Sequence, residues 1–129
     1  MDTMSVNVAT LRSATSVADT RESTRDFLDE LVPAISAGAA DTVVLVVSEL
    51  VTNSLRHGGG TCTLELTAYP DSIEVTVHDP SPQAPHMRTP DLNDDTGGFG
   101  WPMVNRLARA TAVNRQADGK TVSALLPRR

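Results

Sequence analysis

Residues Val43–His57 read VVLVVSELVTNSLRH, and this segment says more about the architecture of the chain than any other. Its first residues are apolar without a break, so a helix here would be buried on most of its sides. Glu49, Asn53 and His57 follow at intervals of four residues, which places them on one side of the helix. A carboxylate beside an amide oxygen can hold a magnesium–phosphate complex and accept a proton from a hydroxyl. This side of the helix is therefore the first candidate site.

An exposed polar stripe is the alternative explanation of the same spacing. Amphipathic helices carry charged and amide side chains toward solvent, and Glu49 with Asn53 fits that pattern in isolation. The apolar run before them favours burial, where a polar group is costly without a partner. On these residues alone, both interpretations stay open.

The preceding sequence predicts a first helix and a short connection. Ser16 is a suitable amino-terminal cap, and helical spacing of apolar and small residues continues from Val17 to Pro33. Residues 34–40 read as a connection. Asp41 can then cap the second helix.

Alternating apolar and polar residues predict two hairpins, one after the Gly58-Gly59-Gly60 triplet that ends the second helix and one at the end of the chain. The expected strands are Thr61–Tyr69, Ile73–Val77, Ala112–Ala117 and Thr121–Leu126. Asp118-Gly119, between the last two, is a favoured turn pair. Residues 1–15 alternate weakly, as an edge strand or a loose arm would.

The order of these elements predicts one α+β domain over residues 1–129. We expect a two-layer sandwich, with helices packed on one face of a mixed, mostly antiparallel sheet. A chain of 129 residues is long enough for a single core but not for two.

A proline-rich loop and a glycine cluster separate the two hairpins. Four of the eight prolines fall between Pro80 and Pro90, so residues 80–96 are expected to form a loop that acts as a lid. Gly97-Gly98-Phe99-Gly100 precedes a helical pattern, and amides at the start of a helix can bind phosphates. The cluster is neither a Walker loop nor a Rossmann fingerprint.

Two further residues have both a functional and a plain interpretation. Asp79 ends a strand, where its carboxylate could accept a hydrogen bond from the exocyclic amine of adenine, but Asp-Pro is also a common turn start. Thr121 could offer a hydroxyl to a phosphate, or it could be an ordinary strand threonine. Neither choice follows from these residues alone.

The bulk composition restricts the classes of function. A net charge of −5 argues against a nucleic-acid surface, which needs a basic stripe. Cys62 is the single cysteine, so an internal disulfide is excluded and a secreted scaffold is not expected. We find no apolar stretch close to the roughly 20 residues that span a bilayer, and no secretory signal in Met1–Ala9. We therefore expect a cytoplasmic protein without nucleic-acid or membrane partners.

The sequence does not match the residue spacing of a calcium-binding loop or of a zinc site. Asp91, Asn93 and Asp95 begin like a calcium loop, but Thr96 stands where glycine is required and Pro102 where a bidentate glutamate belongs. The three histidines show no zinc spacing.

Taken in order, these pieces resemble the GHKL (Bergerat-fold) ATPase superfamily over nearly the whole chain. The segments that are similar to its motifs are Glu49-Leu-Val-Thr-Asn53-Ser-Leu-Arg-His57, Asp79, Gly97-Gly98-Phe99-Gly100 and Gly119-Lys120-Thr121. The short, single-domain length is similar to the anti-sigma-factor serine-protein kinases of bacterial partner-switching systems. The resemblance implies ATP and Mg²⁺ as ligands and Glu49 as the general base. The nucleotide-binding residues that it implies are Asn53, His57, Asp79, Gly98, Gly100 and Thr121.

The implied roles differ among these residues. Asn53 would hold the Mg²⁺ that bridges the phosphates, and Asp79 would accept a hydrogen bond from the adenine amine. Gly98 and Gly100 would let the lid and the following helix approach the phosphates. Thr121 would supply a supporting hydroxyl near the nucleotide.

The function implied is an ATP-binding anti-sigma-factor-type regulator that phosphorylates a serine or threonine of an anti-sigma-factor antagonist. A sigma factor would be the other protein partner, and the resemblance suggests a homodimer. One departure favours an alternative. The family has Asp-x-Gly-x-Gly at the adenine site, whereas this chain has Asp79-Pro80-Ser81-Pro82-Gln83, and glycine is what permits close backbone approach to the base. The alternative is a catalytically silent module that sequesters a partner with weak or no ATP turnover.

Overall fold

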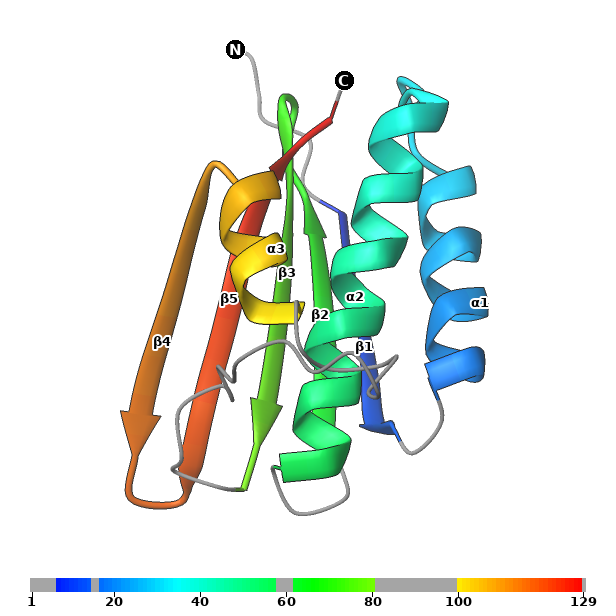
Figure 1. The fold of residues 1–129 in the computed structure, drawn as a ribbon. Coiled ribbons are helices and arrows are strands. Elements are labelled where there is room, and N and C mark those ends of the chain that lie inside the picture. The colour runs from blue at the N-terminus through cyan, green and yellow to red at the C-terminus, as the bar shows by residue number, and fades with distance from the viewer. Residues whose placement is uncertain (1–6, 15–16, 58–61, 81–99, 129) are drawn as a thin grey trace, which may run out of the picture.

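The structure, a computed structural model, describes residues 7–14, 17–57, 62–80 and 100–128, with the backbone alone for residues 7–14 and His57. The helices and strands within these residues are, in chain order, β1 (Asn7–Ala14), α1 (Val17–Asp29), α2 (Ala37–His57), β2 (Cys62–Ala68), β3 (Ser72–Asp79), α3 (Gly100–Leu107), β4 (Ala110–Gln116) and β5 (Gly119–Pro127). Both predicted hairpins and all three predicted helices are present (Figure 1).

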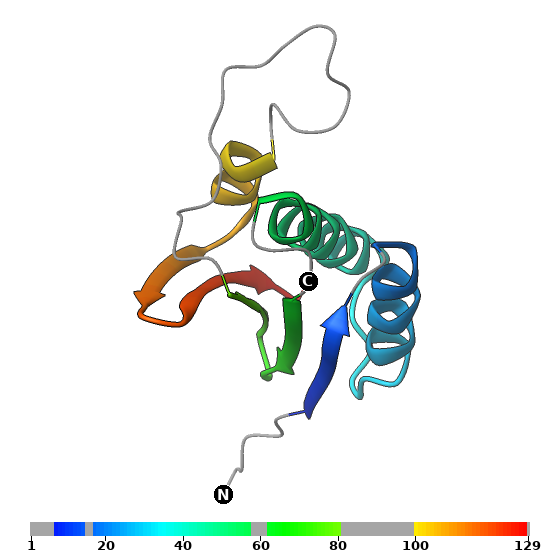
Figure 2. The same ribbon diagram turned by 90° about the horizontal axis from the view of Figure 1, so that it is seen from below.

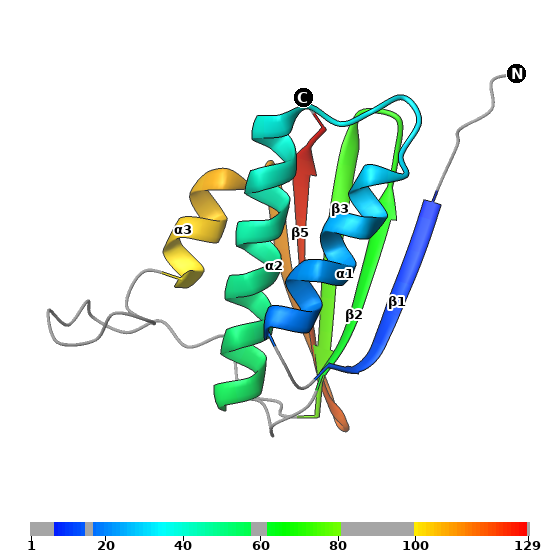
Figure 3. The same ribbon diagram turned by 90° about the vertical axis from the view of Figure 1, so that its right-hand side faces the viewer.

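The strands form one sheet in the order β1-β2-β3-β5-β4, and the helices lie together on one of its faces (Figures 1 and 3). Seen from the end, the sheet curves around α2, with α1 beside the β1 edge and α3 toward the β4 edge (Figure 2). This confirms the two-layer α+β sandwich. The expectation of a mixed sheet was wrong for the described strands, because each of their four pairings is antiparallel.

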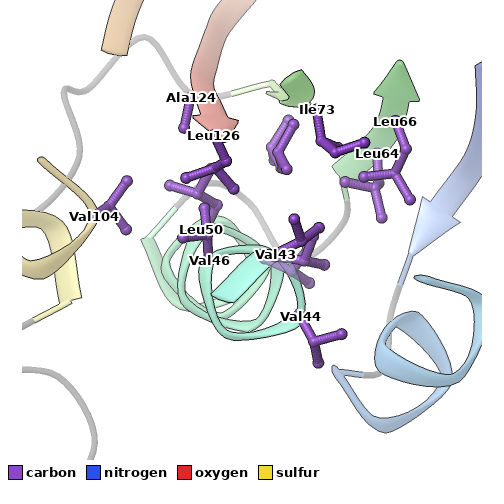
Figure 4. Packing of buried hydrophobic residues seen from close by; sticks show 14 of the residues in the cluster. Val43, Val44, Val46, Leu50, Leu64, Leu66, Ile73, Val104, Ala124 and Leu126 are labelled. Carbon is purple, nitrogen blue, oxygen red and sulfur yellow. The ribbon is translucent and has the colours of Figure 1, made fainter. Parts of the chain in front are cut away.

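The core lies between α2 and the inner face of the sheet (Figure 4). Val43, Val46 and Leu50 of α2 point at this face, and Val104 of α3 closes one side. The strand residues that meet them are Leu64, Leu66, Ala68, Ile73, Val75, Val77, Val122, Ala124 and Leu126. Because these residues alternate along each strand, polar neighbours such as Thr76 and Ser123 occupy the other face.

The start of α2 differs from the prediction. The helix begins at Ala37, and the Ser36 hydroxyl accepts a hydrogen bond from the Ala39 amide at 3.2 Å, so Ser36 is the cap. Asp41 lies within the first turns and forms an exposed ion pair with Arg25 at 3.5 Å. Residues 37–40 of the expected connection are helical, and the alanines around Gly38 favour a helix.

α2 also corrects the expectation about apolar stretches. Residues Ala37–Arg56 are long and apolar enough, by length and composition, to cross a membrane. Half of the stretch is buried in the fold, where it packs against the sheet and both other helices. The apolar character of α2 is that of a core helix.

β1 is an edge strand. Of the two alternatives for residues 1–15, an edge strand or a loose arm, the structure shows the strand over Asn7–Ala14. It pairs with β2 from Asn7 opposite Ala68 to Ala14 opposite Cys62, with an irregular register after Leu11. The predicted lid, residues 80–96, lies outside the described residues apart from Pro80.

Candidate functional site

The last residue of β3, Asp79, lies at the centre of the candidate site. Its side chain is 1% exposed, because it points from the inner face of the sheet toward α2. From α2, the Ser54 hydroxyl donates a hydrogen bond of 2.9 Å to Asp79 Oδ2. The carboxylate therefore faces the helix that carries the candidate catalytic residues.

A lysine of the neighbouring strand β5 pairs with this carboxylate. Lys120 is directly opposite Asp79 in the β3–β5 pairing and is 2% exposed. Its ammonium lies 2.9 Å from Asp79 Oδ2 and 3.1 Å from Oδ1. The two side chains form a buried ion pair in which Lys120 contacts both carboxylate oxygens.

Asn53 and Asp79 line the same pocket. The lining residues are Leu50, Asn53, Ser54, Val77, Asp79, Lys120 and Val122. The volume open to the centre of a water molecule is about 10 Å³, so the space holds about one water. The structure thus brings these two predicted residues together around a pocket much smaller than a purine.

Glu49 lies one helical turn before Asn53 and contacts the start of α3. A methyl group built on Gly100 would come within 2.6 Å of Glu49 Oε1, so the absence of a side chain at Gly100 makes room for this carboxylate. Burial raises the pKa of Glu49 above its usual 4.5, while the positive charges of Arg21 and Arg56 act in the opposite direction. A carboxylate with a raised pKa is better suited to accept a proton near neutral pH.

Thr121 is not brought together with these residues. It is paired with His78 across the β3–β5 ladder, and its hydroxyl lies 3.1 Å from His78 Nδ1. Successive strand residues point to opposite faces, so Thr121 is on the face away from the helices when Lys120 points inward. This arrangement favours the plain interpretation of Thr121 as a strand threonine over the hydroxyl role near a nucleotide.

Two predicted residues cannot be placed. Gly98 lies outside the described residues, and only the backbone is described for His57, at the end of α2. Their expected contacts with a nucleotide stay predictions.

Lys120 and Ser54 are the residues to which the sequence interpretation gave no role. The alternation of Val122, Ala124 and Leu126 on the inner face, continued back by two residues, would have placed Lys120 inward. Ser54 also connects the cluster to Cys62. Burial is the main cause of the raised pKa of the Cys62 thiol, a hydrogen bond with Ser54 opposes it, and the charge of Asp79 adds to it.

The donor chemistry around Asn53 suits a cation that arrives with phosphates. Among the described residues there is no group of three or more His, Cys, Asp or Glu side chains that could hold a metal ion. Mg²⁺ commonly takes one or two protein oxygens, with waters and substrate phosphates completing its shell. The Asn53 amide oxygen could be such a ligand, one turn from the Glu49 carboxylate on α2.

Comparison with known proteins identifies the class. Residues 11–126 match the family described as "Histidine kinase-like ATPase domain", and the chain belongs to this family. This confirms the GHKL resemblance.

One solved structure extends the comparison of the fold. It is the crystal structure of the RsbU and RsbW domains of Rv1364c from Mycobacterium tuberculosis, with a TM-score of 0.69 and 16% sequence identity. The match covers 93% of this chain and 32% of the other, and at this identity it supports the fold alone. No curated protein matches the chain.

Proposed function

We propose that this protein is an anti-sigma-factor-type regulator that transfers a phosphoryl group from ATP to a serine or threonine of an antagonist protein. Membership of the ATPase family implies ATP binding, typically with Mg²⁺. The observation that carries the proposal is the position of Glu49, half-buried against the start of α3, with a raised pKa and Asn53 one turn away.

The proposed reaction needs little covalent chemistry from the protein. The substrate hydroxyl oxygen bonds to the γ-phosphorus, its proton passes to the Glu49 carboxylate, and the bond to the bridging oxygen breaks to release ADP. Asn53 would help to hold Mg²⁺, which supplies charge neutralisation on the phosphates. Gly100 leaves the space in which Glu49 can face the reacting groups.

The test is a comparison of Glu49→Ala with the unaltered protein in phosphotransfer and in nucleotide titration. Loss of the base should reduce phosphotransfer by at least about 100-fold while binding changes little, because positioned proton transfer contributes about 10²- to 10⁴-fold. Glu65→Ala is the matched control, since Glu65 is exposed on β2, on the face away from the helices. Full activity in Glu49→Ala would refute the role of the base.

The partners follow from the same proposal. The similar solved structure includes an RsbW domain, and the chain resembles the anti-sigma-factor kinases in its motifs. We therefore propose a sigma factor and an anti-sigma-factor antagonist as protein partners, a homodimer as the assembled form, and the cytoplasm as the location. Co-purification from the native host followed by mass spectrometry tests the partners, and light scattering of the pure protein tests the dimer.

A silent binding module is the second candidate, and the ion pair of Asp79 with Lys120 favours it. In that case the fold would bind a partner without turnover. Titration with ATP in the presence and absence of Mg²⁺ separates the two, because no binding at millimolar nucleotide supports the module. Magnesium-dependent binding together with transfer to a partner supports the kinase.

A further inference from the structure

We propose that Lys120 prevents this site from recognising adenine through Asp79. The Lys120 ammonium pairs with the Asp79 carboxylate, which would otherwise accept a hydrogen bond from the exocyclic amine of adenine. The protein therefore does not select ATP through its base. This inference rests on the proposed nucleotide site and concerns its specificity. A nucleotide would then be recognised through its phosphates, near Glu49 and Asn53, and not through its base.

The backbone sets the position of Lys120. Asp79 and Lys120 are direct partners in the antiparallel pairing of β3 with β5, both on the inner face. Just before Lys120, Gly119 has a φ of +146°, and a methyl group there would overlap the Asp79 carbonyl oxygen. The two strands therefore approach closely at this point, and Lys120, on the inner face opposite Asp79, places its ammonium against the carboxylate.

The lysine is a stronger partner for Asp79 than an adenine amine would be. Both groups are hydrogen-bond donors, but the ammonium also carries a full positive charge, and charge-assisted hydrogen bonds are about twice as strong as neutral ones. Lys120 contacts both carboxylate oxygens, while Ser54 donates to one of them. Removing the ammonium from a buried pair would leave a buried carboxylate without its counter-ion, which is strongly unfavourable.

The space beside the pair is consistent with this inference. The pocket that Asp79 and Lys120 share with Asn53 has room for about one water, and Leu50, Val77 and Val122 supply its apolar walls. The amine of a purine could take the place of the ammonium on Asp79 only if the lysine side chain moved. The small pocket and the ion pair thus both disfavour recognition of adenine by Asp79.

The experiment compares binding of ATP and purine riboside triphosphate, which carries a hydrogen in place of the amine at position six and is otherwise the same molecule. Calorimetry with Mg²⁺ is run on the unaltered protein, on Lys120→Thr and on Lys120→Thr combined with Asp79→Leu. In the unaltered protein the two affinities should agree within about threefold, because the base does not contribute. Lys120→Thr removes the ammonium, leaves a small hydroxyl beside Asp79 and should prefer ATP by about 10- to 100-fold.

The double variant is the matched control, since it has the same space as Lys120→Thr but no carboxylate to accept the amine. It should lose the preference for ATP. Thermal melts establish that each variant folds, and Lys120→Ser, which opens the same space, replaces Lys120→Thr under the same criteria if the latter does not fold. A preference for ATP in the unaltered protein of about tenfold or more, or no such preference in the folded lysine variant, would overturn the inference.

These outcomes are separate from those of the phosphotransfer test. A gain of ATP preference in Lys120→Thr without any phosphotransfer keeps the role of Lys120 and rejects the kinase. Phosphotransfer by the unaltered protein together with a strong preference for ATP keeps the kinase and rejects the role of Lys120.

Discussion

The Glu49 carboxylate is half-buried where α2 meets the beginning of α3, and its environment disfavours its charge. Burial outweighs the favourable effect of Arg21 and Arg56, so the pKa of Glu49 is raised. A residue whose ionised form is disfavoured by the fold reduces stability where it is charged. Groups with such a cost are common at functional sites.

Glu49→Gln should therefore change stability in a pH-dependent way. Since the folded pKa of Glu49 is raised above 4.5, the unaltered protein loses stability relative to the variant as the pH rises from about 4.5 through that raised pKa. Above this range the variant should stay more stable by a constant amount, and near pH 4 the two should agree. Urea denaturation between pH 4 and 8 measures the difference. A variant that is less stable at pH 7 would contradict the direction of the shift.

At the scale of elements, the β4–β5 turn positions the ion pair. Its two strands pair from Ala110 opposite Leu125 to Gln116 opposite Gly119. Gly119 has a φ of +146°, a conformation that residues with a side chain rarely adopt, and its α-carbon lies close to the Asp79 carbonyl. The glycine is needed here both for its backbone angle and for the contact between β3 and β5.

Gly119→Ala should destabilise the protein by more than about 1 kcal/mol, because the methyl group meets backbone atoms and the φ becomes unfavourable. Gly38→Ala is the matched control, since a methyl group at Gly38 would meet nothing within 4 Å and the helix would gain up to about 1 kcal/mol. Thermal or urea unfolding of both variants measures the two effects. Equal effects would show that the close approach at Gly119 does not matter.

On the scale of the whole molecule, Arg128 connects three segments that are far apart in the sequence. The guanidinium donates hydrogen bonds to the carbonyl of Tyr69, at 2.7 Å, and to the carbonyl of Pro33. The Arg128 amide donates to the carbonyl of Asp71 at 3.2 Å. The end of the chain, the β2–β3 turn and the connection between α1 and α2 are thereby held together by one residue that is 4% exposed.

Arg128→Ala should lower the free energy of unfolding by about 2–4 kcal/mol, because two hydrogen bonds from a charged group are lost and two carbonyls lose their partner. Arg109→Ala is the control. Arg109 forms a half-exposed ion pair with Asp71 at 3.9 Å, so its loss should cost less than about 1 kcal/mol. Equilibrium urea denaturation of the three proteins gives the comparison. Similar losses in both variants would mean that Arg128 does not clamp the three segments.

Most of the architecture could be predicted because it depends on local patterns. Helical spacing, alternation and the Asp118-Gly119 turn identified the helices and strands, and the spacing of Glu49 and Asn53 identified one side of α2. The error at the start of α2 arose because neighbouring residues compete. Ser36 and Asp41 are both good caps, and the choice depends on whether the residues between them join the helix.

The polar side of α2 and the order of the elements follow from the amino-acid sequence, since residues a few positions apart on one element have a fixed geometry. The partner of Asp79 does not follow in this way. Lys120 is 41 residues away, and it becomes the partner because β3 and β5 pair in a register that sets the two residues opposite each other on the inner face. A register shifted by one residue would have placed Thr121 opposite Asp79 instead. The environment of the Asp79 carboxylate is therefore a property of strand pairing, which long-range packing determines.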